Sequence, residues 1–383
     1  MRGIRTFLPE PVKKVIRFFR YGNERRKVVR ELAVRRQQDK QIRDQYDRRC
    51  EKLIVFVVPG ANWFTGEDVV TGGILSIASI YEETRKLEQE HGFQTLMVTG
   101  KNEYLLLKHT KFPNDITVFR FDQVFRYFTA LKHLVIHIPD FMVIRMNPHL
   151  RREAAFLSRI KNLHLNILNQ NIRLMPGRQA VLALQEITPH VTQTTAHEQY
   201  TTQEMRDKYG IPLHRLSVFG SPERYARRPF GEKENLIVLS PDFKPWKNEI
   251  IETIKKELPQ FRFVVIEDMP YLAYLKNIGL AKFTITFGEG LDFYFIETIF
   301  SGGLGISLYN DEFFMDQFAA LPGVFLSVDA LRAGIVNFIR DMDHPASFAA
   351  TNEQQFRAVA TIYKYDEYVA NIRKFYKADY TFK

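Results

Sequence analysis

The chain has 383 residues, of which 45% are apolar and 26% charged, and its formal net charge is +10. This length exceeds what one compact core usually supports, so two domains are expected. A single cysteine, Cys50, excludes a disulfide framework and favours a reducing compartment, and without an apolar run of about 20 residues or a signal-peptide pattern neither a transmembrane helix nor secretion is expected.

The positive charge is concentrated in the first fifty residues. They hold 16 Lys and Arg against 6 Asp and Glu, whereas the rest of the chain holds 38 of each. The basic character therefore belongs to an N-terminal extension, and a general nucleic-acid-binding surface on the body of the protein is not expected.

Residues 12–20 have an amphipathic pattern. Apolar side chains recur at helical spacing opposite basic ones: Val12, Val15, Ile16 and Phe19 against Lys13, Lys14, Arg17 and Arg20. Such a basic helix can lie in an anionic membrane surface, or it can be an ordinary helix packed on the body or a solvated run of charge. Residues 23–50, rich in Arg, Gln and Asp, predict a solvated helical spacer.

The first domain is expected to open with a buried strand at 53–58. A loop leads to a helix at about 74–89, and a strand follows at 93–98, which together make a βαβ unit of a doubly wound sheet. Gly72 and Gly73 leave bare backbone NH groups beside a helix N-terminus, where a phosphate or sugar hydroxyl can bind, although many such turns need glycine only for geometry. No GxGxxG motif is present, so dinucleotide binding is not supported.

Further strands are expected at 117–121 and 134–138. The second places His137 and Asp140 at the carboxyl end of a strand, the edge at which open α/β sheets bind ligands. His137 is either a ligand-binding group or a structural hydrogen-bonding partner.

The end of the first domain is expected near residue 215. The expected elements are segments at 163–169 and 180–184, a strand and helix start within 190–200, a helix within 201–212, and an interdomain linker at 211–234 that is rich in Pro and Gly.

A second βα series begins at residue 236. The expected elements are a strand at 236–240, a loop at 241–248, a helix at 249–257, a strand at 261–266 and a short helix at 271–278. Lys244 and Lys247 precede a helix N-terminus at a strand's carboxyl end, where positive charge and free NH groups suit a diphosphate. Surface lysines in a turn are the alternative.

The stretch 283–308, FTITFGEGLDFYFIETIFSGGLGISL, carries the strongest functional pattern. A buried strand from Phe283 is broken by a turn at 288–290, and a helix up to Phe300 precedes the next strand. Glu289 is expected at the helix entrance, where the macrodipole alone would favour an acid; counted along one helix, it lies about 2.2 turns from Glu297. Glu297 is expected among apolar side chains, so its carboxylate needs hydrogen-bond donors such as sugar hydroxyls.

This order of strand, Glu-Gly, seven-residue gap, Glu, Gly-Gly and strand resembles the signature of retaining GT-B glycosyltransferases, especially glycosyltransferase family 4. Glu289, Gly290, Glu297 and Gly302 match the family pattern in register, whereas Asp292 replaces its second glycine. The family's Gly-Arg-x4-Lys pattern is matched at Lys247, but its Arg falls on Asp242, so that Lys244 is the candidate substitute.

The resemblance implies an α/β protein with two Rossmann-like domains of GT-B type facing across a cleft. It implies metal-independent transfer of a sugar from a nucleotide-sugar to a hydroxyl with retention at the anomeric carbon, and no cofactor besides the donor. Glu289 would be catalytic, near the transferred sugar, with His137 as a further candidate, and Glu297 would bind the ribose. The nucleotide-sugar would also contact Lys247, Lys244, Gly290, Gly72 and Gly73.

The expected domains are a basic extension at 1–50, an acceptor domain at 51–215, a donor domain at 216–360 and a C-terminal helix at 361–383 that crosses back as in GT-B proteins. A basic extension suggests a membrane-borne acceptor, such as a lipid-linked glycan of bacterial surface polysaccharide, and a peripheral position on the cytoplasmic face of the cell membrane. Two alternatives stay open: a non-catalytic GT-B-like scaffold in a membrane polysaccharide complex, favoured by Asp242 and Asp292, and a nucleotide-sugar epimerase, which needs no acceptor.

Overall fold

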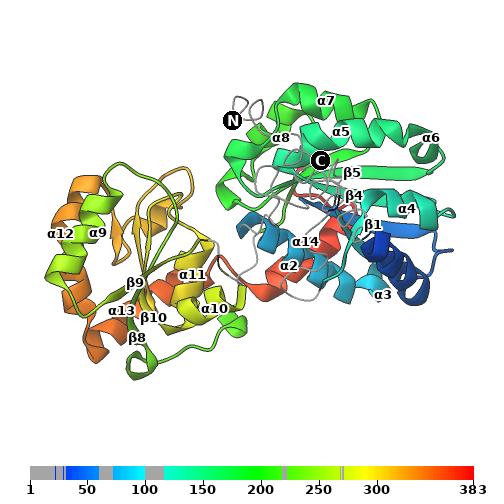
Figure 1. Cartoon of the computed structure of the whole chain (residues 1–383). Coiled ribbons are helices and arrows are strands. Elements are labelled where there is room, and N and C mark those ends of the chain that lie inside the picture. Colours follow the sequence, from blue (N-terminus) through cyan, green and yellow to red (C-terminus); the bar gives the residue numbers. More distant parts are fainter. Residues whose placement is uncertain are drawn as a thin grey trace, which may run out of the picture. The chain divides into compact units, whose positions relative to one another are not determined.

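The computed structural model describes residues 22, 29, 32–59, 72–99, 116–217, 222–267, 269 and 271–383. The chain divides into two compact units (Figure 1). Unit 1 comprises Met1–Thr194, Arg206–Leu213 and Lys383, and unit 2 comprises Thr195–Met205 and His214–Phe382. The amphipathic stretch at 12–20 lies outside the described residues, as does the loop at 60–71.

The first sheet has the strand order β3-β2-β1-β4-β5-β6-β7. Its strands are β1 (Lys52–Val58), β2 (Gln94–Thr99), β3 (Val118–Arg120), β4 (His133–Pro139), β5 (Asn162–Asn169), β6 (Val191–Thr195) and β7 (Leu213–Arg215). The interior strand β1 pairs in parallel with both β2 and β4. Residues 53–58 of β1 are fully buried, as expected for a parallel strand covered on both faces.

Helices connect these strands. They are α2 (Gly72–Lys86), α3 (Glu88–His91), α4 (Phe121–Tyr127), α5 (Val143–Arg152), α6 (Ala154–Leu157), α7 (Arg178–Gln185) and α8 (Gln203–Tyr209), with the 3-10 turns η1 (Asp140–Met142) and η2 (Ile172–Leu174). α8 ends at Gly210, whose φ of +67° is the left-handed conformation that glycine adopts most easily. Gly210 therefore ends this helix.

Two expectations for segments flanking this sheet need correction. Residues 32–45 are helical, as expected, but the helix is solvated on one side only, because a stripe at i, i+4 spacing packs inward: Ile42 and Gln38 are buried, and the Gln38 amide donates to the Val118 carbonyl oxygen at 2.7 Å. The expected linker at 211–234 contains β7, which adds a strand to the sheet.

The second sheet has the order β12-β11-β10-β8-β9, and every neighbouring pair is parallel. Its strands are β8 (Glu234–Leu239), β9 (Arg262–Val265), β10 (Ala281–Thr286), β11 (Leu304–Leu308) and β12 (Val324–Phe325). The helices around it are α9 (Lys247–Glu257), α10 (Tyr271–Leu280), α11 (Phe293–Phe300), α12 (Val328–Met342) and α13 (Pro345–Ala360), with the 3-10 turns η4 (Pro222–Arg224), η5 (Phe230–Glu232) and η6 (Asp316–Phe318). Unit 2 also contains the 3-10 turn η3 (Glu198–Tyr200) and helix α14 (Tyr365–Tyr376). The strands within 236–308 lie within two residues of their expected positions.

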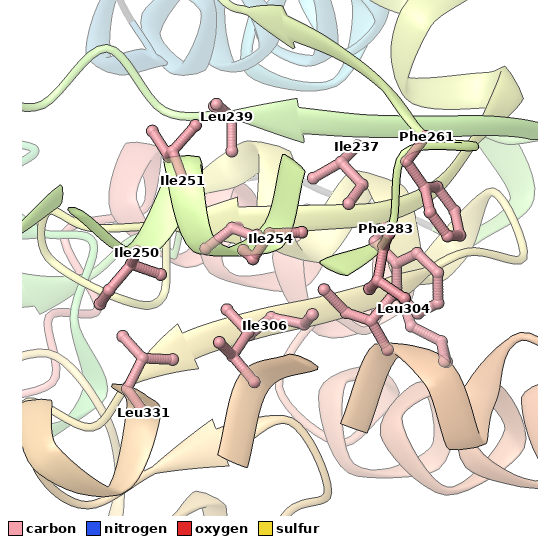
Figure 2. Close-up of a cluster of buried hydrophobic side chains, with 14 of the residues drawn as sticks. Ile237, Leu239, Ile250, Ile251, Ile254, Phe261, Phe283, Leu304, Ile306 and Leu331 are labelled. Atoms are coloured by element: carbon pink, nitrogen blue, oxygen red, sulfur yellow. The ribbon is translucent and has the colours of Figure 1, made fainter. Parts of the chain in front are cut away.

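The second sheet is covered on both faces by helices. Ile237 and Leu239 of β8 pack with Ile254 of α9 in the cluster that Figure 2 shows. The alternate residues Leu236 and Val238 face α10 in a separate cluster. Burying one such side chain stabilises the fold by about 1.5–3 kcal/mol, so the alternation fixes which face each helix covers. Within the described ranges, no helix combines the length and the hydropathy that crossing a lipid bilayer requires.

Candidate functional site

The carboxyl ends of β8 and β10 lie side by side in unit 2. Ile285 of β10 is the register partner of Leu239 of β8, while β9 lies on the other side of β8. Two loops, 240–246 and 287–292, leave the sheet here and are tied together at Ser240. Its backbone NH donates to the Ile285 carbonyl oxygen at 3.1 Å, and its hydroxyl accepts from the Phe287 NH at 3.1 Å. Because the strand order reverses at β8, this is the edge at which a doubly wound sheet binds its ligand.

The turn at 288–290 presents Glu289 between two glycines that have no room for a side chain. A Cβ on Gly288 would lie 2.5 Å from an Asp242 carboxylate oxygen. Gly290 has a φ of +96°, and a Cβ there would lie 2.2 Å from the ring of Phe314. Glu289 itself is half-buried. The glycines thus fix the position of a carboxylate at the edge of the sheet.

Helix α11 begins later than the sequence predicts. Its first residue is Phe293, and Asp292 precedes it with extended backbone while its carbonyl oxygen accepts from the Phe295 and Ile296 NH groups. Glu289 therefore lies in the turn and not at the helix entrance, and the spacing of 2.2 helical turns to Glu297 does not apply. The reason is the left-handed backbone at Gly290, which no α-helix contains.

Acidic side chains gather beside Glu289. The Oδ2 atom of Asp292 is buried and has no hydrogen-bond partner among the described residues. Burial raises the pKa of Asp292 to about 8, with further contributions from the charges of Asp242 and Glu289. The Tyr294 hydroxyl donates to Asp242 Oδ2 at 3.4 Å. Asp292 therefore keeps its proton at neutral pH, which lowers the negative charge of this edge.

The two lysines of the 241–248 loop differ in their surroundings. The Lys247 ammonium is buried and donates to the backbone carbonyl oxygens of Ser240, at 2.5 Å, and Asp242, at 2.9 Å. Burial lowers its pKa. Lys244 is half-buried, and its ammonium group forms no hydrogen bond or ion pair with any described residue. Lys247 thus holds the loop in shape, whereas Lys244 is the cation whose charge is available to a ligand.

Glu297 is buried within α11, as the sequence predicts, and its donors are tyrosines. Tyr225 donates to Oε1 at 2.5 Å, and Tyr274 of α10 donates to Oε2. Burial raises the pKa of Glu297 to about 7 in spite of these hydrogen bonds, which act in the opposite direction. Both carboxyl oxygens therefore have protein partners, and a ribose hydroxyl would have to replace one of them.

In unit 1, His137 is a core residue. None of its surface is exposed, its ring stacks on Phe56 with 4.4 Å between centroids, and the Asn166 amide donates to its Nδ1 atom at 3.0 Å. Burial and the neighbouring His164 lower its pKa well below the usual range, so the ring is neutral. These surroundings match the structural alternative for this histidine, and we leave His137 out of the proposed site.

The edge of the first sheet is built around α2 and the end of β4. Gly72 and Gly73 are the first residues of α2, and the Ser76 hydroxyl one turn later donates to the Gln170 side chain at 2.5 Å. The Asp140 carboxylate accepts three hydrogen bonds from backbone NH groups: those of Gln170, at 2.9 Å, Asn171 and Phe141. These hydrogen bonds connect α2 and the end of β4 to the segment after β5, and the loop at 60–71 lies outside the described residues. In the described part of the chain, no group of three or more His, Cys, Asp or Glu is arranged to hold a metal ion.

Comparison with protein-family models and with curated protein sequences gives no match. Solved structures do match along most of the chain. Sucrose-phosphate synthase from Thermosynechococcus elongatus has a TM-score of 0.52 at 12% identity, covering 85% of this chain and 98% of the other. Anabaena HepE in complex with UDP-glucose has a TM-score of 0.55 at 10% identity, covering 85% and 99%. The chain has the GT-B fold.

The GT-B fold confirms the α/β class and the two Rossmann-like sheets predicted from the sequence. What the sequence did not show is the set of side chains that contact Glu297 and Asp242 in the folded chain. Tyr225 and Tyr274 lie 72 and 23 positions from Glu297, so no local pattern links them. Asp242 and Tyr294 come from different loops in the same way, 52 positions apart. A buried glutamate indicates only that donors exist, not which residues supply them.

Proposed function

We propose that this protein transfers a glycosyl group from a nucleotide-sugar to a hydroxyl group of a glycan. The observation that carries the proposal is Glu289 in its Gly-Glu-Gly turn at the carboxyl end of β10, beside the loop after β8, in a GT-B fold. The similar protein HepE is known in complex with UDP-glucose and with UDP, which supports a nucleotide-sugar as the donor class.

The proposed roles follow the contacts of each side chain. Glu289 accepts hydrogen bonds from hydroxyls of the transferred sugar and stabilises the positive charge that develops at its anomeric carbon. Lys244 neutralises the departing nucleoside diphosphate, and Lys247 keeps the loop after β8 in the shape that brings Lys244 to it. Glu297 binds the ribose by exchanging one tyrosine hydroxyl for a ribose hydroxyl.

Finer features of the reaction are part of the same proposal. Transfer proceeds with retention of configuration and without a metal ion, as the resemblance of the 283–308 stretch implies. A lipid-linked acceptor in surface-polysaccharide assembly, reached through residues 12–20 at the cytoplasmic face of the membrane, is supported by the basic amphipathic pattern of that stretch. The contributions of Gly72 and Gly73 stay a prediction.

Release of nucleoside diphosphate from a panel of nucleotide-sugars, with and without membrane extract as acceptor, tests the proposal. We expect release with at least one donor, an increase when extract is present, and loss of about 100-fold in Glu289→Gln. The exposed Glu252→Gln serves as the matched control and keeps wild-type activity. Release from no donor under either condition would contradict the enzymatic function.

A non-catalytic scaffold is the second candidate, because specific observations favour it. The acids Asp242 and Asp292 add negative charge beside Glu289, which disfavours an anionic diphosphate, and the charged groups of Lys247 and Glu297 already have protein partners. Such a protein would bind a glycan or a donor without turnover. Saturable donor binding with no diphosphate release in the presence of extract would select this candidate.

A further inference from the structure

The segment Thr195–Met205 belongs to unit 2, although it connects β6 and α8. Its centre is η3, and it contacts the loop at 309–318 that follows β11. By sequence it would be assigned to the first domain. Its placement in unit 2 therefore raises the question of what it does there.

Two side chains of η3 bind a single atom of that loop. The Gln199 amide donates to the Glu312 carbonyl oxygen at 2.9 Å, and the Tyr200 hydroxyl donates to the same oxygen at 3.0 Å. A carbonyl oxygen has two lone pairs, so this acceptor is saturated from outside its own loop. The His197 ring packs on Phe313 with 5.6 Å between centroids. We call the two hydrogen bonds from Gln199 and Tyr200 to the Glu312 carbonyl oxygen the clamp.

The clamped residue is joined tightly to Phe314. Asn310 accepts from the Phe314 NH through its carbonyl oxygen at 2.8 Å, and from the Glu312 NH through its side chain at 3.1 Å. Residues 310–314 therefore form one tight turn. A displacement of Glu312 moves the ring of Phe314 with it.

Phe314 shapes the turn that carries Glu289. The ring is buried, packs edge-on against Phe295 of α11, and fills the space that a Gly290 side chain would occupy, 2.2 Å from the Cβ position. On the other side of the turn, the Thr286 hydroxyl donates to the Gly290 carbonyl oxygen at 3.0 Å. The left-handed backbone at Gly290 is thus held between a hydroxyl and an aromatic ring.

We propose that Gln199 and Tyr200 are positioning residues for Glu289, acting through Glu312 and Phe314 on the 288–290 turn. The proposal rests on the function proposed above for Glu289. It assigns a role in sugar transfer to a segment that lies about 90 residues before the glutamate in the sequence. Removing the clamp loosens the turn while leaving β8, β10 and the Lys247-braced loop in place.

Hydrogen exchange and kinetics of Gln199→Leu, Tyr200→Phe and the double variant test this role. In the double variant we expect amide exchange in residues 286–292 to rise about tenfold and kcat to fall on the order of tenfold. The Kd of the nucleoside diphosphate should change less than kcat, since the cation proposed to bind the diphosphate is Lys244, on the separate loop that Lys247 braces. Tyr309→Phe is the matched control, because it removes a hydroxyl that donates to Asp316 within the same loop, and it should change neither quantity.

Unchanged exchange in residues 286–292 of the double variant would overturn the proposal. So would an equal rise in exchange across β8 and β10, because that would show a general loss of stability. If the wild-type protein transfers no sugar from any donor, the proposed function fails, and the exchange measurement still decides whether the clamp positions the turn. The two single variants, each of which keeps one donor to Glu312, provide the same comparison if the double variant does not fold.

Discussion

Glu297 shows how a buried acid couples the stability of this protein to pH. Its folded-state pKa of about 7 lies above the ordinary glutamate value of 4.5 because burial disfavours the charged carboxylate. Stability from this group is fully present below pH 4.5 and is lost as pH rises to about 7, since the unfolded chain releases the proton first. The loss amounts to about 3 kcal/mol.

Glu297→Gln should therefore stabilise the protein at alkaline pH. The amide keeps the shape and hydrogen-bonding capacity of the protonated acid but cannot ionise. We expect little change at about pH 5 and a gain of about 1–3 kcal/mol in the free energy of unfolding at about pH 8, measured by urea denaturation. Glu252→Gln is the surface control. Equal loss of stability at both pH values would contradict a raised pKa at Glu297.

Asp292 should make donor binding depend on pH. Below about pH 8 it carries a proton, and above this pH its negative charge, next to Asp242 and Glu289, repels an anionic diphosphate. We expect the affinity for the nucleoside diphosphate to fall about 3–10-fold between about pH 6.5 and about pH 9.5. In Asp292→Asn the affinity should change little over this range. Titrating the nucleoside diphosphate into the wild-type protein and the variant at both pH values measures this affinity. An identical pH dependence in the two proteins would exclude Asp292 as the group responsible.

Side-chain partners were the least predictable feature of the site. The burial of Glu297 and the importance of the Gly-Glu-Gly turn followed from apolar neighbours and glycine spacing. The tyrosine partners of Glu297 and the closing of Lys247 onto backbone carbonyls did not, because they depend on loops that meet only in the folded chain. Side-chain contacts of this kind leave no periodic signal.

The unit of strand β10, turn and helix α11 is the element on which the site depends. Gly290→Ala should damage it, because the Cβ would overlap the ring of Phe314 and the left-handed backbone would be strained. We expect a loss of about 2–4 kcal/mol in the free energy of unfolding, measured by urea denaturation. Adding Phe314→Leu should recover part of this loss by removing the ring. No recovery in the double variant would show that the ring is not the cause.

We expect two N-terminal segments to have different roles, one in membrane binding and one in the structure of unit 1. Residues 32–45 pack on unit 1, with Arg35 held to Asp122 by two hydrogen bonds of 3.0 and 3.2 Å, whereas residues 12–20 carry the amphipathic pattern. Deleting residues 1–22 should leave the Tm almost unchanged and abolish sedimentation with anionic vesicles. Neutral vesicles are the control. Retained binding to anionic vesicles would remove the basis for a membrane-borne acceptor.

Elements were predicted well where the signal was strictly periodic. The strands of unit 2 were placed because parallel strands covered on both faces are continuous apolar runs. The helix at 32–45 was placed but its burial was missed, since only Val34, Gln38 and Ile42 form the inward stripe among many charged neighbours. The start of α11 was missed because a Gly-rich turn and the first turn of a helix have similar composition.

The GT-B fold was predictable from the alternation of strand and helix signals together with one short motif. The function was less predictable, because the same fold with Asp242 and Asp292 at the edge formed by β8 and β10 is compatible with a catalyst or a scaffold. The deciding property is whether the edge formed by β8 and β10 binds a nucleotide-sugar.

Tryptophan fluorescence measures this binding most directly. The chain has two tryptophans, Trp63 and Trp246, and Trp246 precedes Lys247 and packs on Phe287 with 5.7 Å between ring centroids. In Trp63→Phe, Trp246 is the only reporter and lies on the loop after β8. The proposed function predicts a saturable change in its emission with at least one nucleotide-sugar, and a weaker affinity in Lys244→Ala. No saturable change with any nucleotide-sugar would contradict a donor site at this edge.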